Sequence, residues 1–347
     1  MRVKNLIFLL ICFLLLYLVK ISFAAKDYVW SDKSFKIAVL PNEIIDKGKI
    51  KTITINSINQ SDIDLVIFTG DTKDGSSVCS DEVIGKKLID YFNKINAPVI
   101  YSVGDNEWTD CHRVSNGSYD PLERLSYIRR IFFNKPYTQG KNHLPVDRQG
   151  KLGDKFSENS RLIYHNVMLV SLHVVGSNNN LVSSDKLCFK KSKRTWKDCE
   201  KATDEYRERN KANIKWLKES FAIAKKKNLK AVIVAIQADI YYPYVPTIKG
   251  YKKFLKNLNE KNGFTDFFNV LKEETISFPG QVLLVHGDTH FFQFDKPMFF
   301  ESNWTIVPNF SRVETFGGKE TSWVEITVNP NDPQNMFVIK PVVLPAL

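Results

Sequence analysis

Oxygen- and nitrogen-bearing side chains gather in four short segments, each placed directly after an apolar run. The segments are TGDTKD (69–74), GDNEWTDCH (104–112), IQAD (236–239) and HGDTH (286–290). The carboxyl ends of strands in an α/β sheet form the edge where such folds place their ligand sites. Carboxylates that converge there repel one another unless a cation neutralises them. Together with amide and imidazole groups they suit Mn, Fe, Zn or Mg. The pattern predicts a divalent-metal site, and a solvated acidic rim is the alternative.

The elements that would position these segments are visible in the hydrophobic pattern. Apolar runs predict strands at residues 37–40, 65–68, 98–103, 162–163, 167–175, 231–236, 283–285, 304–307, 323–328 and 337–343. Helical spacing predicts helices at 81–96, with Ser80 as the N-cap, and at 203–226 and 251–274. Strands that alternate with helices indicate an α/β fold. No internal repeat or long linker is present, so residues 25–347 are expected to form a single domain.

The N-terminus has the pattern of a secretory signal. Arg2 and Lys4 precede an apolar run at residues 6–19, and Ser22 and Ala24 are small residues at the positions that a signal peptidase reads. This predicts a signal peptide at residues 1–24 and a secreted or periplasmic protein. The run is short for a membrane span, and no second candidate span follows. A retained N-terminal anchor is the alternative.

The charge of the chain is basic. Removal of residues 1–24 takes away three of 49 basic residues and none of 38 acidic ones, which leaves 46 minus 38, or +8. This charge favours anionic partners, such as a phosphorylated small molecule or an anionic surface. A solvated lysine-rich surface is the alternative reading. Nucleic acid is not an expected partner, because no basic motif with interleaved aromatic residues occurs.

The four cysteines that remain after export predict two disulfides. Cys79 and Cys111 follow two consecutive strands, whose end loops are expected to be neighbours. Cys188 and Cys199 would close a short loop. The hypothesis for the basic segment 186–201 around them, which includes Lys190, is that it guards the site and contributes to the capture of anionic substrate, and a solvated disulfide loop without such a role is the favoured alternative.

The order GDxxD, then G-[ND]-x-[DE], then a late Gly-x-x-His resembles the calcineurin-like metallophosphoesterase superfamily. GDNEWTDC and HGDTH look like the motifs of an exported branch of that superfamily. The resemblance covers roughly residues 35–328. It implies a four-layer αββα sandwich with two divalent ions at the strand ends. It also implies hydrolysis of phosphate esters by a metal-bound hydroxide.

The resemblance also implies a role for each polar residue. Asp71 would bridge the two ions, and the other metal ligands would be Asp105, Gln237, Asp288, His290 and Asn42. Asn106 would assist the leaving group, and His112 is the candidate proton source. The ligands would be supported from behind by Asp74, Glu107 and His286. Because Asn42 stands where the superfamily has an aspartate, the His290 site is expected to be the weaker one, and Asn42→Asp is expected to tighten it.

The sequence therefore predicts an exported metal-dependent phosphoesterase. A non-catalytic member that binds a phosphorylated or anionic ligand is an alternative, motivated by the amides Asn42, Asn106 and Gln237. A basic surface-interaction protein is another. The motifs of serine hydrolases, P-loop NTPases and dinucleotide-binding folds do not occur. The sequence does not indicate the oligomeric state.

Overall fold

The computed structural model describes residues 32–46 and 49–345. The predicted signal peptide lies outside these residues. Within them, no helix combines the length and the apolar character that crossing a membrane requires.

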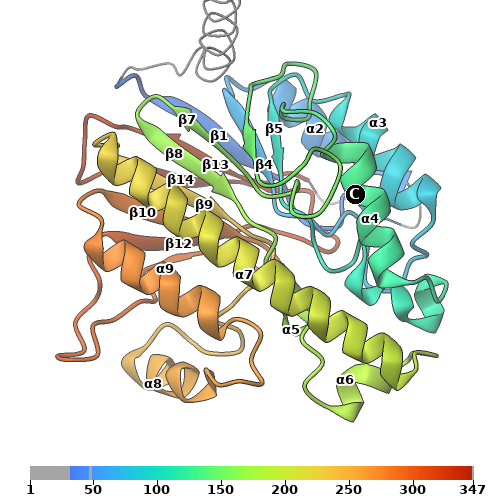
Figure 1. The fold of residues 1–347 in the computed structure, drawn as a ribbon. Coiled ribbons are helices and arrows are strands. Elements are labelled where there is room, and N and C mark those ends of the chain that lie inside the picture. The colour runs from blue at the N-terminus through green and yellow to red at the C-terminus, as the bar shows by residue number, and fades with distance from the viewer. Residues whose placement is uncertain (1–31, 47–48, 346–347) are drawn as a thin grey trace, which may run out of the picture.

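Two mixed β-sheets lie at the centre of the fold (Figure 1). The first has the strand order β14-β13-β1-β4-β5, and the second has the order β11-β12-β10-β9-β8-β7-β6. Strands β1, β4 and β5 run parallel in the first sheet, as do β8, β9, β10 and β12 in the second. The strands of the first sheet are β1 (Phe35–Val39), β4 (Leu65–Phe68), β5 (Val99–Tyr101), β13 (Trp323–Val328) and β14 (Phe337–Val342). Those of the second are β6 (Asp147–Arg148), β7 (Ser160–Tyr164), β8 (Val167–Ser171), β9 (Ala231–Ala235), β10 (Gln281–His286), β11 (Gln293–Asp295) and β12 (Phe310–Glu314). A separate hairpin joins β2 (Ile45–Asp46) to β3 (Lys49–Ile50).

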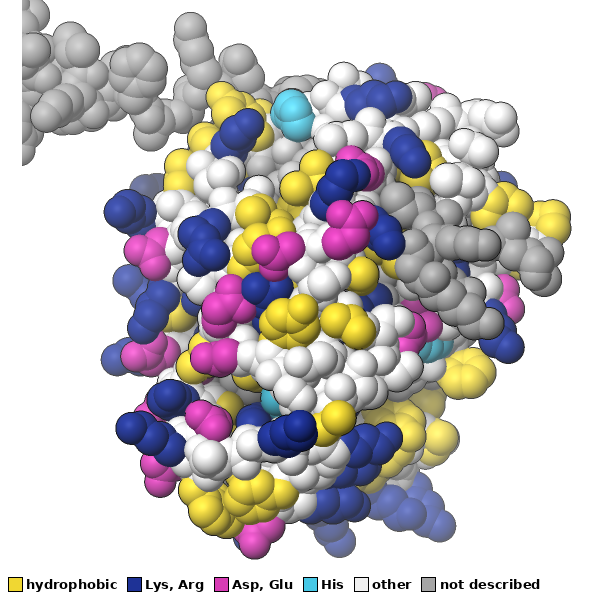
Figure 2. Space-filling view, turned by 90° about the vertical axis from the view of Figure 1, so that its right-hand side faces the viewer, with side chains coloured by type: hydrophobic (Ala, Val, Ile, Leu, Met, Phe, Trp, Pro, Cys, Tyr) yellow, Lys and Arg dark blue, Asp and Glu magenta, His cyan; other side chains and the backbone are white. Residues whose placement is uncertain are grey.

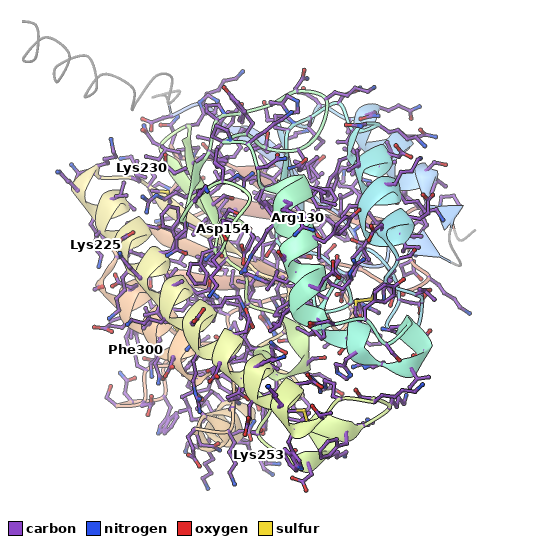
Figure 3. All side chains as sticks on the ribbon, turned by 45° about the vertical axis from the view of Figure 1, so that its right-hand side comes forward. Arg130, Asp154, Lys225, Lys230, Lys253 and Phe300 are labelled. Atoms are coloured by element: carbon purple, nitrogen blue, oxygen red, sulfur yellow. A yellow bond between two sulfur atoms is a disulfide. The ribbon has the colours of Figure 1, made fainter. Side chains whose placement is uncertain are left out.

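Helices cover the outer face of each sheet. The first sheet carries α2 (Thr52–Asn59), the π-helical η1 (Glu82–Lys87), α3 (Leu88–Phe92) and α4 (Pro121–Phe132). The second carries α7 (Trp196–Lys226), α8 (Ile248–Asn257) and α9 (Thr265–Ser277). Short helical turns lie in the loops: η2 (Thr109–His112), η3 (Val114–Asn116), α5 (Gly176–Asn179) and α6 (Asp185–Phe189). Figure 3 marks Arg130 on α4 and Lys225 on α7, in the two different outer layers.

Three apolar clusters hold these layers together. The inner cluster joins the facing sides of the sheets, with Ile37 and Ile67 from the first and Ile233 and Leu283 from the second. The other two clusters join each sheet to its own helices. The order of layers is therefore helix, sheet, sheet, helix. This confirms the four-layer αββα sandwich.

Three predicted elements differ from the structure. The expected helix at 251–274 is two helices, because the chain turns at residues 258–264, where the Asn262 side chain accepts a hydrogen bond from the Phe264 amide. The expected strand at 304–307 is a single bridge between Phe299 and Ile306. Helix α7 begins before residue 203, because Thr195 and Asp198 form a capping box. The Ser80 hydroxyl accepts from the Val83 amide, as expected of a cap, although the helix opens with π-helical turns.

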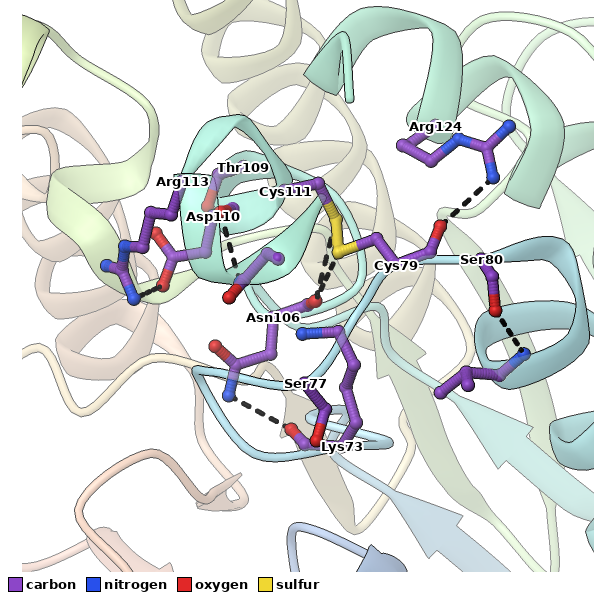
Figure 4. Close-up of a disulfide and its surroundings, with 12 residues drawn as sticks. Lys73, Ser77, Cys79, Ser80, Asn106, Thr109, Asp110, Cys111, Arg113 and Arg124 are labelled. Carbon is purple, nitrogen blue, oxygen red and sulfur yellow. Dashed lines mark hydrogen bonds and ion pairs between the residues drawn. A yellow bond between two sulfur atoms is a disulfide. The ribbon is translucent and has the colours of Figure 1, made fainter. Parts of the chain in front are cut away.

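Both predicted disulfides are confirmed. Cys79 pairs with Cys111, and Cys188 pairs with Cys199. The first joins the loops that follow β4 and β5, which are adjacent parallel strands. Its sulfurs lie 3.6 and 3.7 Å from the Asn106 carbonyl oxygen (Figure 4). This is a contact and not a hydrogen bond, since a disulfide carries no proton.

A buried ion pair connects α4 to the second sheet. The Glu158 carboxylate is 2% exposed and accepts two hydrogen bonds from the Arg129 guanidinium. The same carboxylate lies 2.8 Å from Nδ1 of His173, whose ring packs against Trp108. Arg129 and His173 hold the pKa of Glu158 well below its ordinary value despite its burial. The pair therefore contacts the GDNEWTDCH loop through His173, which packs against Trp108 of that loop.

Replacing Glu158 with glutamine should cost about 3 kcal/mol of unfolding free energy, because it leaves the Arg129 charge buried and unpaired. Glu208→Gln is the control, since Glu208 pairs with Lys155 at the exposed surface and contributes at most about 1 kcal/mol. Denaturant unfolding at pH 7 measures both. Equal losses in the two variants would contradict a supporting role for the buried pair.

Candidate metal centre

Three carboxylates from three strand ends converge at one edge of the sandwich. Asp71 follows β4, Asp105 comes shortly after β5 and Asp288 follows β10. One oxygen from each lies within 4.8 Å of the others. The first two come from the first sheet and Asp288 comes from the second, so the cluster joins the ends of both sheets.

Two glycines let the Asp71 and Asp105 loops approach each other. A Cβ atom on Gly70 would lie 2.3 Å from the backbone nitrogen of Gly104, and one on Gly104 would lie 2.3 Å from that of Asp71. Gly70 also has φ +82°. The Gly-Asp order of both motifs thus has a steric reason, because any side chain at the glycine would push the two aspartates apart.

The backbone around the cluster adopts a conformation that is rare for side-chain-bearing residues. Glu43, Asp71, Asp288 and His290 have φ values of +58°, +57°, +86° and +71°. Such residues cost of order 1–3 kcal/mol each and gather at functional sites. Four of them at one sheet edge support the assignment of this edge as the site.

Glu107 fixes the Asp71 loop from behind. Its fully buried carboxylate accepts hydrogen bonds from the amides of Asp71 (3.2 Å) and Thr72 (2.7 Å) and from the Thr72 hydroxyl. Tyr101 donates to the same carboxylate. Glu107 therefore holds the loop and does not contact the cluster through its own oxygens, in agreement with the supporting role expected from the sequence.

The charges of the cluster are only partly compensated within the protein. Burial, followed by the nearby Asp105, Glu107 and Asp288, raises the pKa of Asp71 well above its ordinary value. Burial and Asp105 do the same to the pKa of Asp288. Buried like charges at this spacing require protons or a cation. Three carboxylate oxygens suit a hard divalent ion, so the residues fit a metal, which Asp71, Asp105 and Asp288 would hold.

Gln237 faces the cluster with its amide nitrogen. Its Oε1 accepts from the Gly176 amide at 2.6 Å, which fixes the orientation of the side chain. Its Nε2 lies 2.9 Å from Asp71, 3.3 Å from Asp105 and 3.2 Å from Asp288. In this orientation Gln237 is a hydrogen-bond donor to the carboxylates. Its predicted role as a ligand would require the amide to turn.

Asn42 has protein partners at both ends of its amide. Its Nδ2 donates to the Gly70 carbonyl at 2.5 Å, and its Oδ1 accepts from the Asp288 amide at 3.0 Å. A Cβ on Gly287 would lie 1.9 Å from that oxygen. Asn42 thus links the loop of Asp71 to the loop of Asp288, and the structure does not direct it at the carboxylates.

His290 is not part of the three-carboxylate cluster, and it lies beside Glu43, a residue outside the recognised sequence motifs. Its Nε2 is 3.8 Å from Glu43, and burial followed by Lys51 lowers its pKa. Glu43 follows Asn42 directly, shortly after the end of the first strand. This strand-end position is the one feature of the sequence that could have marked Glu43 as a site residue. A second ion would find His290 and Glu43 here, but within the described residues they are not part of the 4.8 Å cluster.

The remaining predicted residues organise loops. The Asn106 side chain donates to the Lys73 carbonyl at 3.2 Å (Figure 4). Its backbone amide donates to the Asp71 carboxylate. Asp74 accepts from the amides and hydroxyls of Ser76 and Ser77. His286 is fully buried, with Nδ1 on the Gly287 carbonyl at 2.9 Å. Within the described residues, neither Asp74 nor His286 is part of the 4.8 Å carboxylate cluster.

The expectation that His112 supplies a proton does not agree with its surroundings. Burial, together with the positive charges of Arg194 and Arg113, lowers the pKa of His112 to about 3. The imidazole is therefore neutral at pH 7. The same surroundings reveal residues that sequence reasoning missed, namely Ser177, Arg113 and Arg194. Ser177 donates to Asp105 or Asp110, at 2.7 and 2.8 Å.

Comparison with solved structures places this architecture. No family model and no curated protein matches the sequence. The structure of PhoD is similar over 91% of this chain and 69% of its own, at a TM-score of 0.52 and 11% identity. The chain has the metallophosphoesterase fold. More distant matches are a dimetal phosphatase from Danio rerio (TM-score 0.46, 9% identity, 89% of this chain, 96% of that one) and a 5'-nucleotidase from Candida albicans (0.40, 12%, 92% and 52%).

Divalent metal should stabilise the folded protein, because it binds the cluster only when the three loops are assembled. A hundredfold excess of free Mn²⁺ over its dissociation constant should add about 2.7 kcal/mol. Asp105→Asn should remove most of this gain, whereas Asp90→Asn, in an exposed pair with Lys86, should keep it. Thermal unfolding with Mn²⁺ and with chelator tests this. Identical Mn²⁺ effects in both variants would contradict binding at the cluster.

Asn42→Asp should now destabilise the chelated protein instead of improving the site. The new carboxylate would place an oxygen against the Gly70 carbonyl, at an expected cost of about 1–3 kcal/mol. Asn331→Asp is the control, because Asn331 donates to the Asp32 carbonyl at the exposed surface. Denaturant unfolding in chelator measures the cost. Unchanged stability with tighter metal binding would support Asn42 as a ligand.

Proposed function

We propose that this protein is a metal-dependent phosphoesterase. The observation that carries the proposal is the cluster of Asp71, Asp105 and Asp288, which comes from three strand ends and lacks an internal counter-cation among the described residues within ion-pair distance. The metallophosphoesterase fold supports it. A divalent ion held there would lower the pKa of a bound water and polarise a phosphoryl oxygen.

The chain itself contributes positioning and charge. Asp71, Asp105 and Asp288 would hold one ion, and His290 and Glu43 are the residues available to a second. Gln237 and Asn42 hold the carboxylates at their spacing, and Asn106 ties the loop of Asp105 to that of Asp71. The expected asymmetry between a tight and a weak metal position agrees with this arrangement, since His290 lies outside the carboxylate cluster.

Export is part of the same proposal. The predicted signal peptide motivates it, and the two disulfides support it, because such bonds persist in oxidising compartments. A basic surface-binding protein is less well supported. Figure 2 shows basic and acidic side chains interspersed over the face it presents.

A specific observation favours a second candidate, a member that binds an anionic ligand without hydrolysing it. The Gln237 amide donates hydrogen bonds to all three carboxylates and so offsets part of their repulsion in the absence of an ion. Metal content separates the two candidates. A protein that retains no divalent ion after purification and none after incubation with Mn²⁺ fits the second.

Hydrolysis should be metal-dependent and should require the cluster. The test uses the mature protein with Mn²⁺, Zn²⁺ or Mg²⁺ and two substrates, p-nitrophenyl phosphate for monoesters and bis(p-nitrophenyl) phosphate for diesters. Asp71→Asn should lower kcat/KM by about 1,000-fold or more, since several kcal/mol of transition-state stabilisation are lost. Asp74→Asn is the control carboxylate outside the cluster. Metal-bound protein that hydrolyses neither ester would contradict the proposal.

A further inference from the structure

A basic cavity of about 240 Å³ opens between η2 and the segment that contains α6. Five of its thirteen lining residues are basic and only one, Asp110, is acidic. The basic residues are Arg113, Lys186, Lys190, Lys191 and Arg194. The predicted guard segment, residues 186–201, thus does line a cavity.

The cavity is adjacent to the carboxylate cluster. Ser177 and Asp110 line it, and the Ser177 hydroxyl lies 2.7 Å from Asp105 and 2.8 Å from Asp110. The cavity and the carboxylate cluster are therefore adjacent through Ser177, close enough for a single ligand to be considered for both.

Most of this positive charge forms no ion pair within the described residues, although Asp110 and Asp198 lie near enough to Arg194 to oppose the lowering of its pKa by burial. Arg113 pairs with Asp110 at 2.6 Å, but no carboxylate lies within ion-pair distance of Lys186, Lys190, Lys191 or Arg194 in the part of the chain that the structure describes. Arg113 and Arg194 are close enough that their charges lower the pKa of His112. Such a concentration of like charge favours an anionic ligand.

The segment that carries Lys186, Lys190, Lys191 and Arg194, here called the basic wall, is held in a defined position. The Cys188–Cys199 disulfide ties α6 to the start of α7. The Arg194 guanidinium donates to the carbonyls of Leu187 and Cys188, and the Val114 amide donates to the Lys191 carbonyl at 2.9 Å. These contacts attach the wall to the loop that carries Asp105, so the spacing between cavity and cluster is fixed by the fold.

We infer that this cavity binds a second anionic group of the substrate, so that the preferred substrates are phosphate esters whose alcohol portion carries another phosphate. The inference rests on the proposed function, because it assigns the ester that is cleaved to the carboxylate cluster. The cavity is smaller than the 300–1,000 Å³ usual for whole ligands, and so suits one group of a larger molecule. Guanidinium and ammonium groups are the usual partners of phosphate oxygens.

Binding of adenosine 3′,5′-bisphosphate and of AMP in Mn²⁺ tests the inference, because the two differ only by one phosphate. The KM for phosphate release, or the dissociation constant from calorimetry where neither nucleotide is hydrolysed, should be about tenfold lower for the bisphosphate at low salt, and the preference should shrink at high salt. In Lys186→Glu/Lys190→Glu the preference should be lost while the affinity for AMP changes much less. Both lysines are exposed, so this variant is expected to fold.

The control is Lys197→Glu/Lys211→Glu, which makes the same change in net charge on exposed positions of α7 outside the cavity. It should keep the preference. Equal binding of the two nucleotides by the wild type, or equal loss in both double variants, would overturn the inference. Phosphate release, measured in parallel, separates it from the proposed function. A preference without hydrolysis contradicts the proposed function alone, and hydrolysis without a preference contradicts the inference alone.

Discussion

The mutual repulsion of Asp71, Asp105 and Asp288 is the constraint on which the rest of this site depends. Their oxygens approach within 4.8 Å in a buried setting, where like charges are costly. The fold imposes this approach through features that have no other evident purpose. Gly70 and Gly104 remove the side chains that would separate two of the loops, and Glu107 adds a fourth, buried carboxylate behind Asp71. Holding the three carboxylates together therefore lowers the free energy of unfolding of the protein when no cation is bound.

Amide side chains reduce this repulsion, because they place hydrogen-bond donors among the carboxylates. Gln237 donates to the three carboxylates, and Asn42 joins two of their loops through its oxygen and its nitrogen. Each amide has a structural role of its own, because each forms hydrogen bonds with buried backbone or carboxylate groups that would otherwise lack a partner. The same contacts explain how the loops can be assembled before an ion is bound.

The sequence predicted those features that follow from local pattern and strand order. The strand-end positions of Asp71, Asp105 and Asp288 required only apolar runs, and the Cys79–Cys111 pairing required only the adjacency of consecutive strands. The Cys188–Cys199 pairing followed from their short separation in the sequence, and the layer order was implied by the family resemblance. The helix break at residues 258–264 and the partners of Asn42 were not predictable, because they depend on tertiary contacts. For the same reason, the depressed pKa of His112 could not be foreseen, since Arg194 is distant in sequence and reaches it only through the docked disulfide segment.

The site combines a negatively charged carboxylate cluster with a positively charged cavity beside it. Binding of a cation at the first and of an anion at the second would therefore affect each other. The carboxylate cluster repels an anionic ester unless an ion reverses its charge, whereas the neighbouring basic cavity attracts the same molecule at all times. Ser177 connects the two regions, because its hydroxyl lies 2.7 Å from Asp105 of the cluster and 2.8 Å from Asp110 of the cavity. An anion can therefore occupy the cavity before the cluster is neutralised, but it can contact both regions favourably only afterwards. Because linked binding is reciprocal, an anionic substrate that spanned both regions as proposed would also tighten a metal ion held by the cluster. Under that proposal, the affinity of the cluster for an ion would depend on the cavity as well, and the basic segment would influence the metal centre through the bound anion.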